Sequence, residues 1–118
     1  MKTVLVVDDA AFMRLTLKNM LTKNGFEVVG EAENGVQAVQ KCTELQPDIV
    51  TLDITMPEMS GIDALKEIVK VSPGSNVVMV SALGQETMVK ESVVLGAKGF
   101  VVKPFKEEII IAALSKFK

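Results

Sequence analysis

The chain has 118 residues, of which 48% are apolar and 24% are charged, an ordinary composition for a soluble globular domain. This length allows one domain with its own core and is too short for two. A net charge of −2 without any basic run argues against nucleic acid as a direct partner. No segment is apolar and long enough to cross a bilayer, and an aspartate pair follows the start too soon for a signal peptide. The single cysteine, Cys42, excludes an internal disulfide, so we expect a cytoplasmic protein.

The chain opens with two strand–helix units. Residues 3–7 are a short apolar run, typical of a strand buried on both faces, and they end at a pair of aspartates. Apolar residues then recur with helical spacing until Asn24-Gly25 ends the helix. Residues 26–30 predict the second strand, and Asn34 is placed to cap the second helix. The expected inner faces of the two helices are Met13, Leu17, Met20 and Leu21 in the first, and Val36, Val39 and Cys42 in the second.

The third strand, residues 48–53, is the one around which the chain is organised. Its apolar run stops at a single carboxylate, Asp53. Pro57 then breaks regular pairing, and Ser60 with Asp63 is typical of the start of a helix. We therefore expect Asp53 at the carboxyl end of a central strand, which is where open α/β sheets bind their ligands.

Two further units complete the chain. Residues 76–80 predict the fourth strand, which runs into Ser81-Ala82, and residues 86–95 predict the fourth helix. Residues 99–102 predict the fifth strand, and the last helix is expected from about Lys106 to the end. Strands that alternate with helices imply right-handed crossovers and a parallel sheet covered on both faces.

The predicted fold is therefore α/β, with a doubly wound, five-stranded parallel sheet of the flavodoxin-like (βα)5 type, in one domain spanning residues 1–118. The carboxyl ends of all its strands share one edge. A single polar strand end carries little information, but polar residues from four strands converge on this edge. They are Asp8, Asp9, Asp53, Ser81 and Lys103.

These residue types point to phosphoryl chemistry. Neighbouring carboxylates repel one another and need a cation, and hard oxygen ligands suit Mg²⁺, which pairs well with phosphate oxygens. A carboxylate can also be a nucleophile that forms an aspartyl phosphate, and Asp53 is the best candidate because it is central. A lysine, a hydroxyl and the metal would neutralise the charge on the transferring group. Ala82, beside Ser81, leaves the space that a phosphoryl group needs.

The whole set of motifs resembles the receiver domain of bacterial response regulators. The motifs are D-D after the first strand, D-I-T-M-P-x-M-S-G after the third, S-A after the fourth and K-P-F after the fifth. The resemblance covers the whole chain and is strongest to stand-alone regulators of chemotaxis. It implies a signalling phosphoacceptor that catalyses only its own phosphorylation and dephosphorylation.

The same resemblance assigns roles to the site residues. It implies that a sensor histidine kinase transfers a phosphoryl group from a phosphohistidine to Asp53. Asp9, Asp53 and the backbone carbonyl of Thr55 would hold Mg²⁺, with Asp8 contacting the ion through water. Lys103 would bind one phosphoryl oxygen, and Ser81 would move to bind another. The Lys103–Pro104 bond would be cis.

The resemblance also implies partners and a switch. The phosphorylated form would bind the flagellar motor switch protein, and a phosphatase is a possible further partner. We expect a monomer that contacts neither nucleic acid nor membrane. Phe100 stands where receivers often carry a switching tyrosine, so Ser81 and Phe100 are the expected switch residues. Thr55 and Leu83 occupy positions that tune the lifetime of the phosphoryl group in the family.

Three alternatives remain open at this point. Two of them, a phosphorelay intermediate and the receiver domain of a larger regulator, lie within the same family. The third and least favoured is an aspartyl-phosphate phosphatase. Asp53-Ile54-Thr55 partly resembles the D-x-D-x-T motif of those enzymes, but the second aspartate is missing. No G-x-x-x-x-G-K loop is present, which argues against nucleotide hydrolysis.

Overall fold

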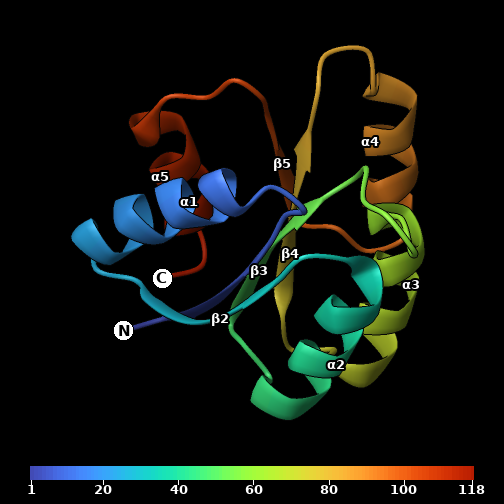
Figure 1. Cartoon of the computed structure of the whole chain (residues 1–118), viewed down its shortest axis with the longest axis horizontal. Helices are drawn as coiled ribbons and strands as arrows, with labels where there is room; N and C mark the ends of the chain where they lie inside the picture. Colours follow the sequence, from blue (N-terminus) through green and yellow to red (C-terminus); the bar gives the residue numbers. More distant parts are fainter.

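A computed structural model describes residues 1–118, and it alternates five strands with five helices (Figure 1). No helix has the length and hydropathy needed to cross a membrane. In chain order the elements are β1 (Thr3–Val7), α1 (Ala11–Lys23), β2 (Glu27–Ala32), α2 (Gly35–Leu45), β3 (Ile49–Asp53), α3 (Gly61–Val71), β4 (Asn76–Ser81), α4 (Glu86–Val94), β5 (Gly99–Val102) and α5 (Glu107–Ser115). All ten elements were predicted. The largest differences lie at β2, which starts and ends later than expected, and at the end of α5, which stops before the last residues.

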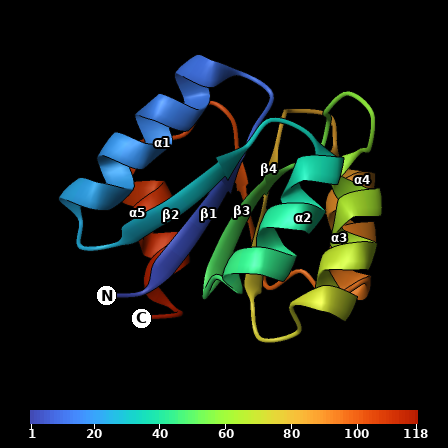
Figure 2. The same ribbon diagram turned by 60° about the horizontal axis from the view of Figure 1, so that its bottom comes forward.

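The sheet is parallel throughout, with strand order β2-β1-β3-β4-β5. Helices α1 and α5 cover one face, and α2, α3 and α4 cover the other (Figures 1 and 2). This confirms the predicted doubly wound α/β fold. The chain winds outward in opposite directions from the neighbouring strands β1 and β3, so the carboxyl ends of these two strands form the crevice where such folds bind ligands.

Each face of the sheet carries its own hydrophobic core, because successive side chains of a strand point to opposite faces. Strand β1 shows this clearly. Leu5 and Val7 join the core beneath α2 and α3, whereas Val4 and Val6 join the core beneath α1 and α5. All five residues of β3 are buried. Burial on both faces explains why the sequence of β3 reads as a continuous apolar run.

The helix caps follow the sequence pattern at two of the five helices. The Asn34 side chain accepts a hydrogen bond of 2.8 Å from the Gln37 backbone N–H at the start of α2. At the start of α3, Ser60 Oγ accepts one of 3.2 Å from the Asp63 backbone N–H. Both bonds satisfy N–H groups that a helix leaves without partners in its first turn.

The inner face predicted for α2 was wrong at one position. Val36 is exposed, and the face toward the sheet is formed by Gly35, Ala38 and Cys42. Val36 and Cys42 are six positions apart, which places Val36 about 120° away from Cys42 around the helix. Cys42 itself is buried as predicted, and burial raises the pKa of its thiol to about 12. The thiol is therefore protonated and unreactive at neutral pH.

Candidate functional site

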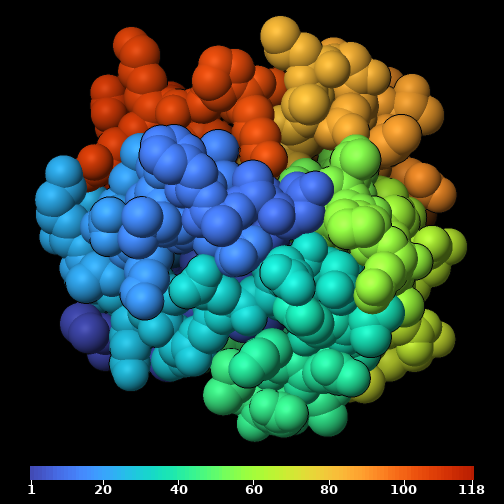
Figure 3. Space-filling model, in the orientation of Figure 1, coloured from blue at the N-terminus to red at the C-terminus, as the bar shows by residue number.

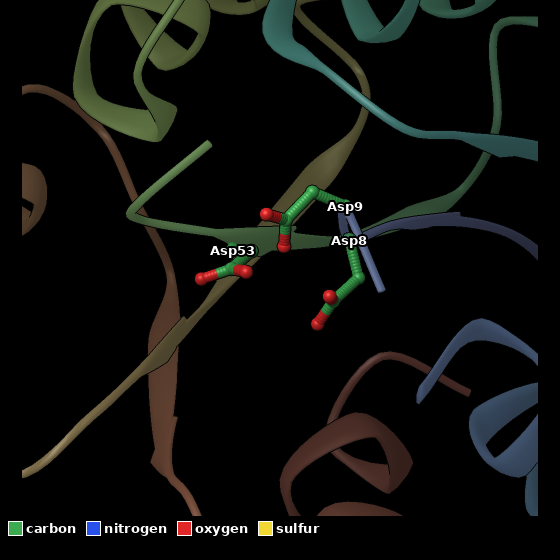
Figure 4. Close-up of side chains that lie close together, drawn as sticks. All are labelled: Asp8, Asp9 and Asp53. Carbon is green, nitrogen blue, oxygen red and sulfur yellow. The ribbon is translucent and has the colours of Figure 1, made fainter. Parts of the chain in front are cut away.

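Three carboxylates meet at the crevice between β1 and β3. Oxygen atoms of Asp8, Asp9 and Asp53 all lie within 4.8 Å of one another, and Figure 4 shows the three side chains together at the ends of the two strands. Asp8 and Asp53 are buried, with 1% and 7% of their surface exposed, whereas Asp9 is exposed to solvent. In the space-filling view the blue N-terminal part of the chain abuts the green middle part on this face of the molecule (Figure 3).

The loop after β1 is held in place by its own backbone and by Arg14. Asp8 Oδ1 accepts a hydrogen bond of 2.9 Å from the Ala10 backbone N–H. Arg14 Nη1 donates to the backbone carbonyl of Asp8 over 2.7 Å, and Arg14 Nε pairs with Glu31 on β2 over 3.1 Å. These contacts orient the Asp8 carboxylate before any ligand binds. Nothing in the sequence pattern indicates this role for Arg14, which lies in the first turn of α1.

Lys103, which follows the edge strand β5, brings a positive charge to the cluster. Its Nζ lies 2.9 Å from Asp8 Oδ2 and 3.4 Å from Asp53 Oδ2. Burial opposes the charged amine, but the hydrogen bond to Asp8 and the charge of Asp53 outweigh it, so the pKa of Lys103 lies above its ordinary value. The Lys103–Pro104 peptide bond is cis, as expected.

Asp53 is a carboxylate in an unfavourable environment. Burial is the main reason that its pKa rises from 3.8 to about 6; the charge of Lys103 counteracts this rise and the charge of Asp8 adds to it. The Thr55 backbone N–H donates a hydrogen bond of 3.3 Å to Asp53 Oδ1. At neutral pH Asp53 is ionised, and it lacks full compensation for its charge.

The cluster fits a small divalent cation. Its three carboxylates supply only hard oxygen donors, and a single lysine faces them. Magnesium binds oxygens at about 2.0–2.1 Å, and the carboxylate oxygens here lie within 4.8 Å of one another, near enough to share one small ion. Residues Asp8, Asp9 and Asp53 could therefore hold Mg²⁺, and the ion would offset their mutual repulsion.

The two predicted switch residues make no hydrogen bond to the acids. The Ser81 hydroxyl donates to the Val101 carbonyl at 3.5 Å. Phe100 is 51% exposed. It borders a largely apolar groove of about 630 Å³ between α4 and β5, which also includes Ser81 and Leu83.

One contact near the site involves a residue to which sequence analysis assigned no role. The Gln85 side-chain amide accepts a hydrogen bond of 2.6 Å from the Ala82 backbone N–H and donates one of 2.7 Å to Thr55 Oγ1. A glutamine in a loop after a strand carries no periodic signal that reveals its contacts. Only its proximity to Ser81 along the chain could have indicated a role.

The fold and the acid cluster define the class of protein, and comparison with known proteins agrees. Residues 4–115 match the response regulator receiver domain family, and the chain belongs to this family. Receiver domains of this type are signalling proteins of two-component systems.

Within the family, the chain is similar to chemotaxis regulators. It is 58% identical to the chemotaxis protein CheY of Thermotoga maritima, covering 98% of this chain and 96% of that protein. It is 56% identical to CheY of Bacillus subtilis, covering 96% of this chain and 94% of that protein. A solved CheX–CheY–BeF3–Mg²⁺ complex from Borrelia burgdorferi matches with a TM-score of 0.93 and 40% identity, over 99% of this chain and 90% of that chain.

Proposed function

We propose that this chain is a single receiver domain, residues 1–118, that carries a chemotaxis signal by reversible phosphorylation of Asp53. A sensor histidine kinase supplies the phosphoryl group, and the phosphorylated form binds the flagellar motor switch in the cytoplasm as a monomer. The observation that carries the proposal is the buried, incompletely compensated Asp53 carboxylate, with Lys103 Nζ 3.4 Å away and two further aspartates beside it. The relatives named as chemotaxis proteins support the chemotactic role.

The proposed chemistry is a phosphoryl transfer between two side chains. A carboxylate oxygen of Asp53 forms a bond to phosphorus, the bond from phosphorus to the donor's imidazole nitrogen breaks, and the imidazole leaves with the electron pair. Lys103 donates to the oxygens of the transferring group, and Ser81 turns from Val101 toward them. Bound at Asp8, Asp9, Asp53 and the Thr55 carbonyl, Mg²⁺ would neutralise part of the negative charge on the phosphoryl oxygens. Water later hydrolyses the acyl phosphate and restores Asp53.

The test uses a small phosphodonor. Acetyl phosphate is expected to label the wild-type chain once, on Asp53, and only when Mg²⁺ is present. Intact mass spectrometry measures the added phosphoryl group, and peptide mapping locates it. Lys103→Ala is expected to keep Mg²⁺ binding and to slow labelling, because Lys103 faces the phosphoryl oxygens while the acids face the ion. Undiminished labelling of Asp53→Asn at another residue would contradict the assignment.

We propose that the output runs through Ser81 and Phe100. When Ser81 moves toward the phosphoryl group it vacates space beside β5, and the half-exposed Phe100 ring can turn into the groove next to it. The ring carries no hydroxyl that needs a partner, so burial alone favours the inward position. Burying most of a ring contributes roughly 1.5–3 kcal/mol, which biases a two-state equilibrium by tenfold or more.

Phe100→Ala is therefore expected to be labelled normally at Asp53. Phosphorylation should increase its affinity for the partner by a factor about ten times smaller than in wild type. The measurement is affinity for the purified flagellar motor switch protein with and without BeF3⁻ and Mg²⁺. Phe12→Ala is the matched control, because Phe12 is 78% exposed on α1 and lies outside the groove. A full wild-type gain in Phe100→Ala would show that the coupling takes another route.

A further inference from the structure

Gln85 ties together the two loops that carry the reacting groups. It occupies the residue before α4, where a polar side chain often caps the helix, yet it makes no capping bond. Its Oε1 instead accepts from the Ala82 N–H within its own loop, and its Nε2 donates to Thr55 Oγ1 in the loop after β3. One polar end of the side chain therefore holds the β4–α4 loop and the other joins it to the loop after β3, and neither caps α4.

The two anchor points adjoin the reacting groups directly. Thr55 lies in the loop after β3, and its backbone N–H donates to the Asp53 carboxylate. Ala82 follows Ser81, whose hydroxyl is turned away toward Val101. One partly exposed side chain thus links the loop of the phosphoacceptor to the loop of the hydroxyl that must move toward it.

The bond to Ala82 occupies a hydrogen-bond donor that a phosphorylated site would need. A phosphoryl group on Asp53 presents three oxygens, and each requires a donor or a metal. Lys103 and Ser81 supply side-chain donors at this edge of the sheet. The Ala82 N–H is the next donor along the same loop, and in this structure Gln85 Oε1 accepts from it.

We propose that Gln85 is a latch that holds the β4–α4 loop in the unphosphorylated arrangement and must release Ala82 when Asp53 is phosphorylated. It acts as a positioning residue through Ala82 and Thr55 and does not touch the reacting atoms. This inference rests on the proposed function and adds to it a control on how readily the site is occupied. The latch opposes phosphorylation, so its removal strengthens binding of the phosphoryl group.

The test is binding of beryllofluoride, a phosphoryl mimic, at a fixed Mg²⁺ concentration, followed by the ¹⁹F NMR signal of the bound fluoride. Gln85→Met keeps the length of the side chain and removes both hydrogen bonds. Because one neutral hydrogen bond changes an equilibrium severalfold, we expect the half-saturating beryllofluoride concentration to fall about three- to tenfold. Gln40→Met, the same substitution at an exposed position on α2, should leave it unchanged.

A double-mutant cycle with Thr55→Val tests whether the effect of Gln85→Met comes from its hydrogen bond to Thr55 or from an unrelated change in the loop. Thr55→Val removes one of the two anchors and should also tighten binding. In the Gln85→Met background the same change should have little further effect, because the bond is already absent. Additive effects of the two substitutions would overturn the latch.

Failure of this inference is distinguishable from failure of the proposed function. If wild-type protein binds no beryllofluoride with Mg²⁺ and is not labelled at Asp53, the proposed function fails. If wild type binds but Gln85→Met binds equally or more weakly, Gln85 is not a latch of this kind. Thermal melts of each variant confirm that the compared proteins are folded.

Discussion

Replacing Gly61 with alanine is expected to destabilise the fold by about 3 kcal/mol or more and to abolish efficient labelling of Asp53. Gly61 is the first residue of α3, where the helix passes directly over the end of β3. An added Cβ would lie inside the van der Waals contact of the Asp53 carbonyl oxygen and 2.7 Å from the Ile54 Cα. Both obstacles are backbone atoms, so no side-chain rotation relieves the clash.

The clash also affects the site, because the backbone that must move carries the phosphoacceptor. The Gly61 N–H donates a hydrogen bond of 2.7 Å to the Ile54 carbonyl, which fixes α3 against the loop after β3. A shift at Asp53 or Ile54 displaces the Asp53 carboxylate relative to Lys103 and Asp8. The same displacement of the backbone is therefore expected to lower both the stability and the rate of phosphorylation.

Urea denaturation measures the free energy of unfolding, and acetyl phosphate labelling measures the site. Gly74→Ala is the matched control, because a Cβ there meets nothing within 4 Å and the backbone is not in the left-handed region. Its stability should stay within about 0.5 kcal/mol of wild type. A Gly61→Ala protein as stable as Gly74→Ala would show that α3 can move away from β3 at little cost.

The sequence was sufficient to predict the edge of the sheet at which the site lies. Asp8, Asp53 and Lys103 each end or follow a short apolar run that predicts a strand, and parallel strands bring their carboxyl ends together. Residue type and the parallel arrangement of the strands are therefore enough to place these side chains at one edge. The structure adds the distances, with Lys103 within 3.4 Å of both buried acids.

The contacts that side chains in loops make could not be predicted from the sequence. Gln85 has no periodicity to reveal its direction, and its two bonds depend on how two loops fold toward each other. The close approach of Gly61 to β3 is likewise a property of how α3 packs. Val36 shows a related limit, since a short helix with few apolar residues allows more than one inner face, and the structure buries Gly35, Ala38 and Cys42 instead of Val36.

Replacing Asp53 with asparagine is expected to stabilise the metal-free protein at neutral pH. Burial raises the pKa of Asp53 from 3.8 to about 6, so the folded state holds a proton more tightly than the unfolded state does. The resulting contribution to stability is fully present below about pH 4 and is lost as the pH rises through about 6. Asparagine does not ionise, so the variant avoids this loss.

The expected gain of Asp53→Asn over wild type is therefore smallest near pH 4 and rises to at most about 3 kcal/mol above pH 7, from a shift of about two pKa units. Urea denaturation with a chelator at several pH values measures it. Asp48→Asn serves as a control of opposite sign. Hydrogen bonds from the Thr3 backbone N–H and hydroxyl lower the pKa of Asp48, so that variant should lose stability at neutral pH and recover relative to wild type on acidification.

Adding Mg²⁺ should narrow the difference in stability between wild type and Asp53→Asn. In wild type, an ion present at about 100 times its dissociation constant stabilises the folded state by about 2.7 kcal/mol, because only the folded chain assembles Asp8, Asp9 and Asp53. In Asp53→Asn the ion loses one anionic ligand and the gain shrinks. Metal binding thus offsets the cost of burying the ionised Asp53.

Two outcomes would contradict this account. If Mg²⁺ stabilises both proteins equally, Asp53 is not a ligand of the ion. If Asp53→Asn is less stable than wild type in chelator at pH 7.5, the charge of the Asp53 carboxylate is already compensated without metal.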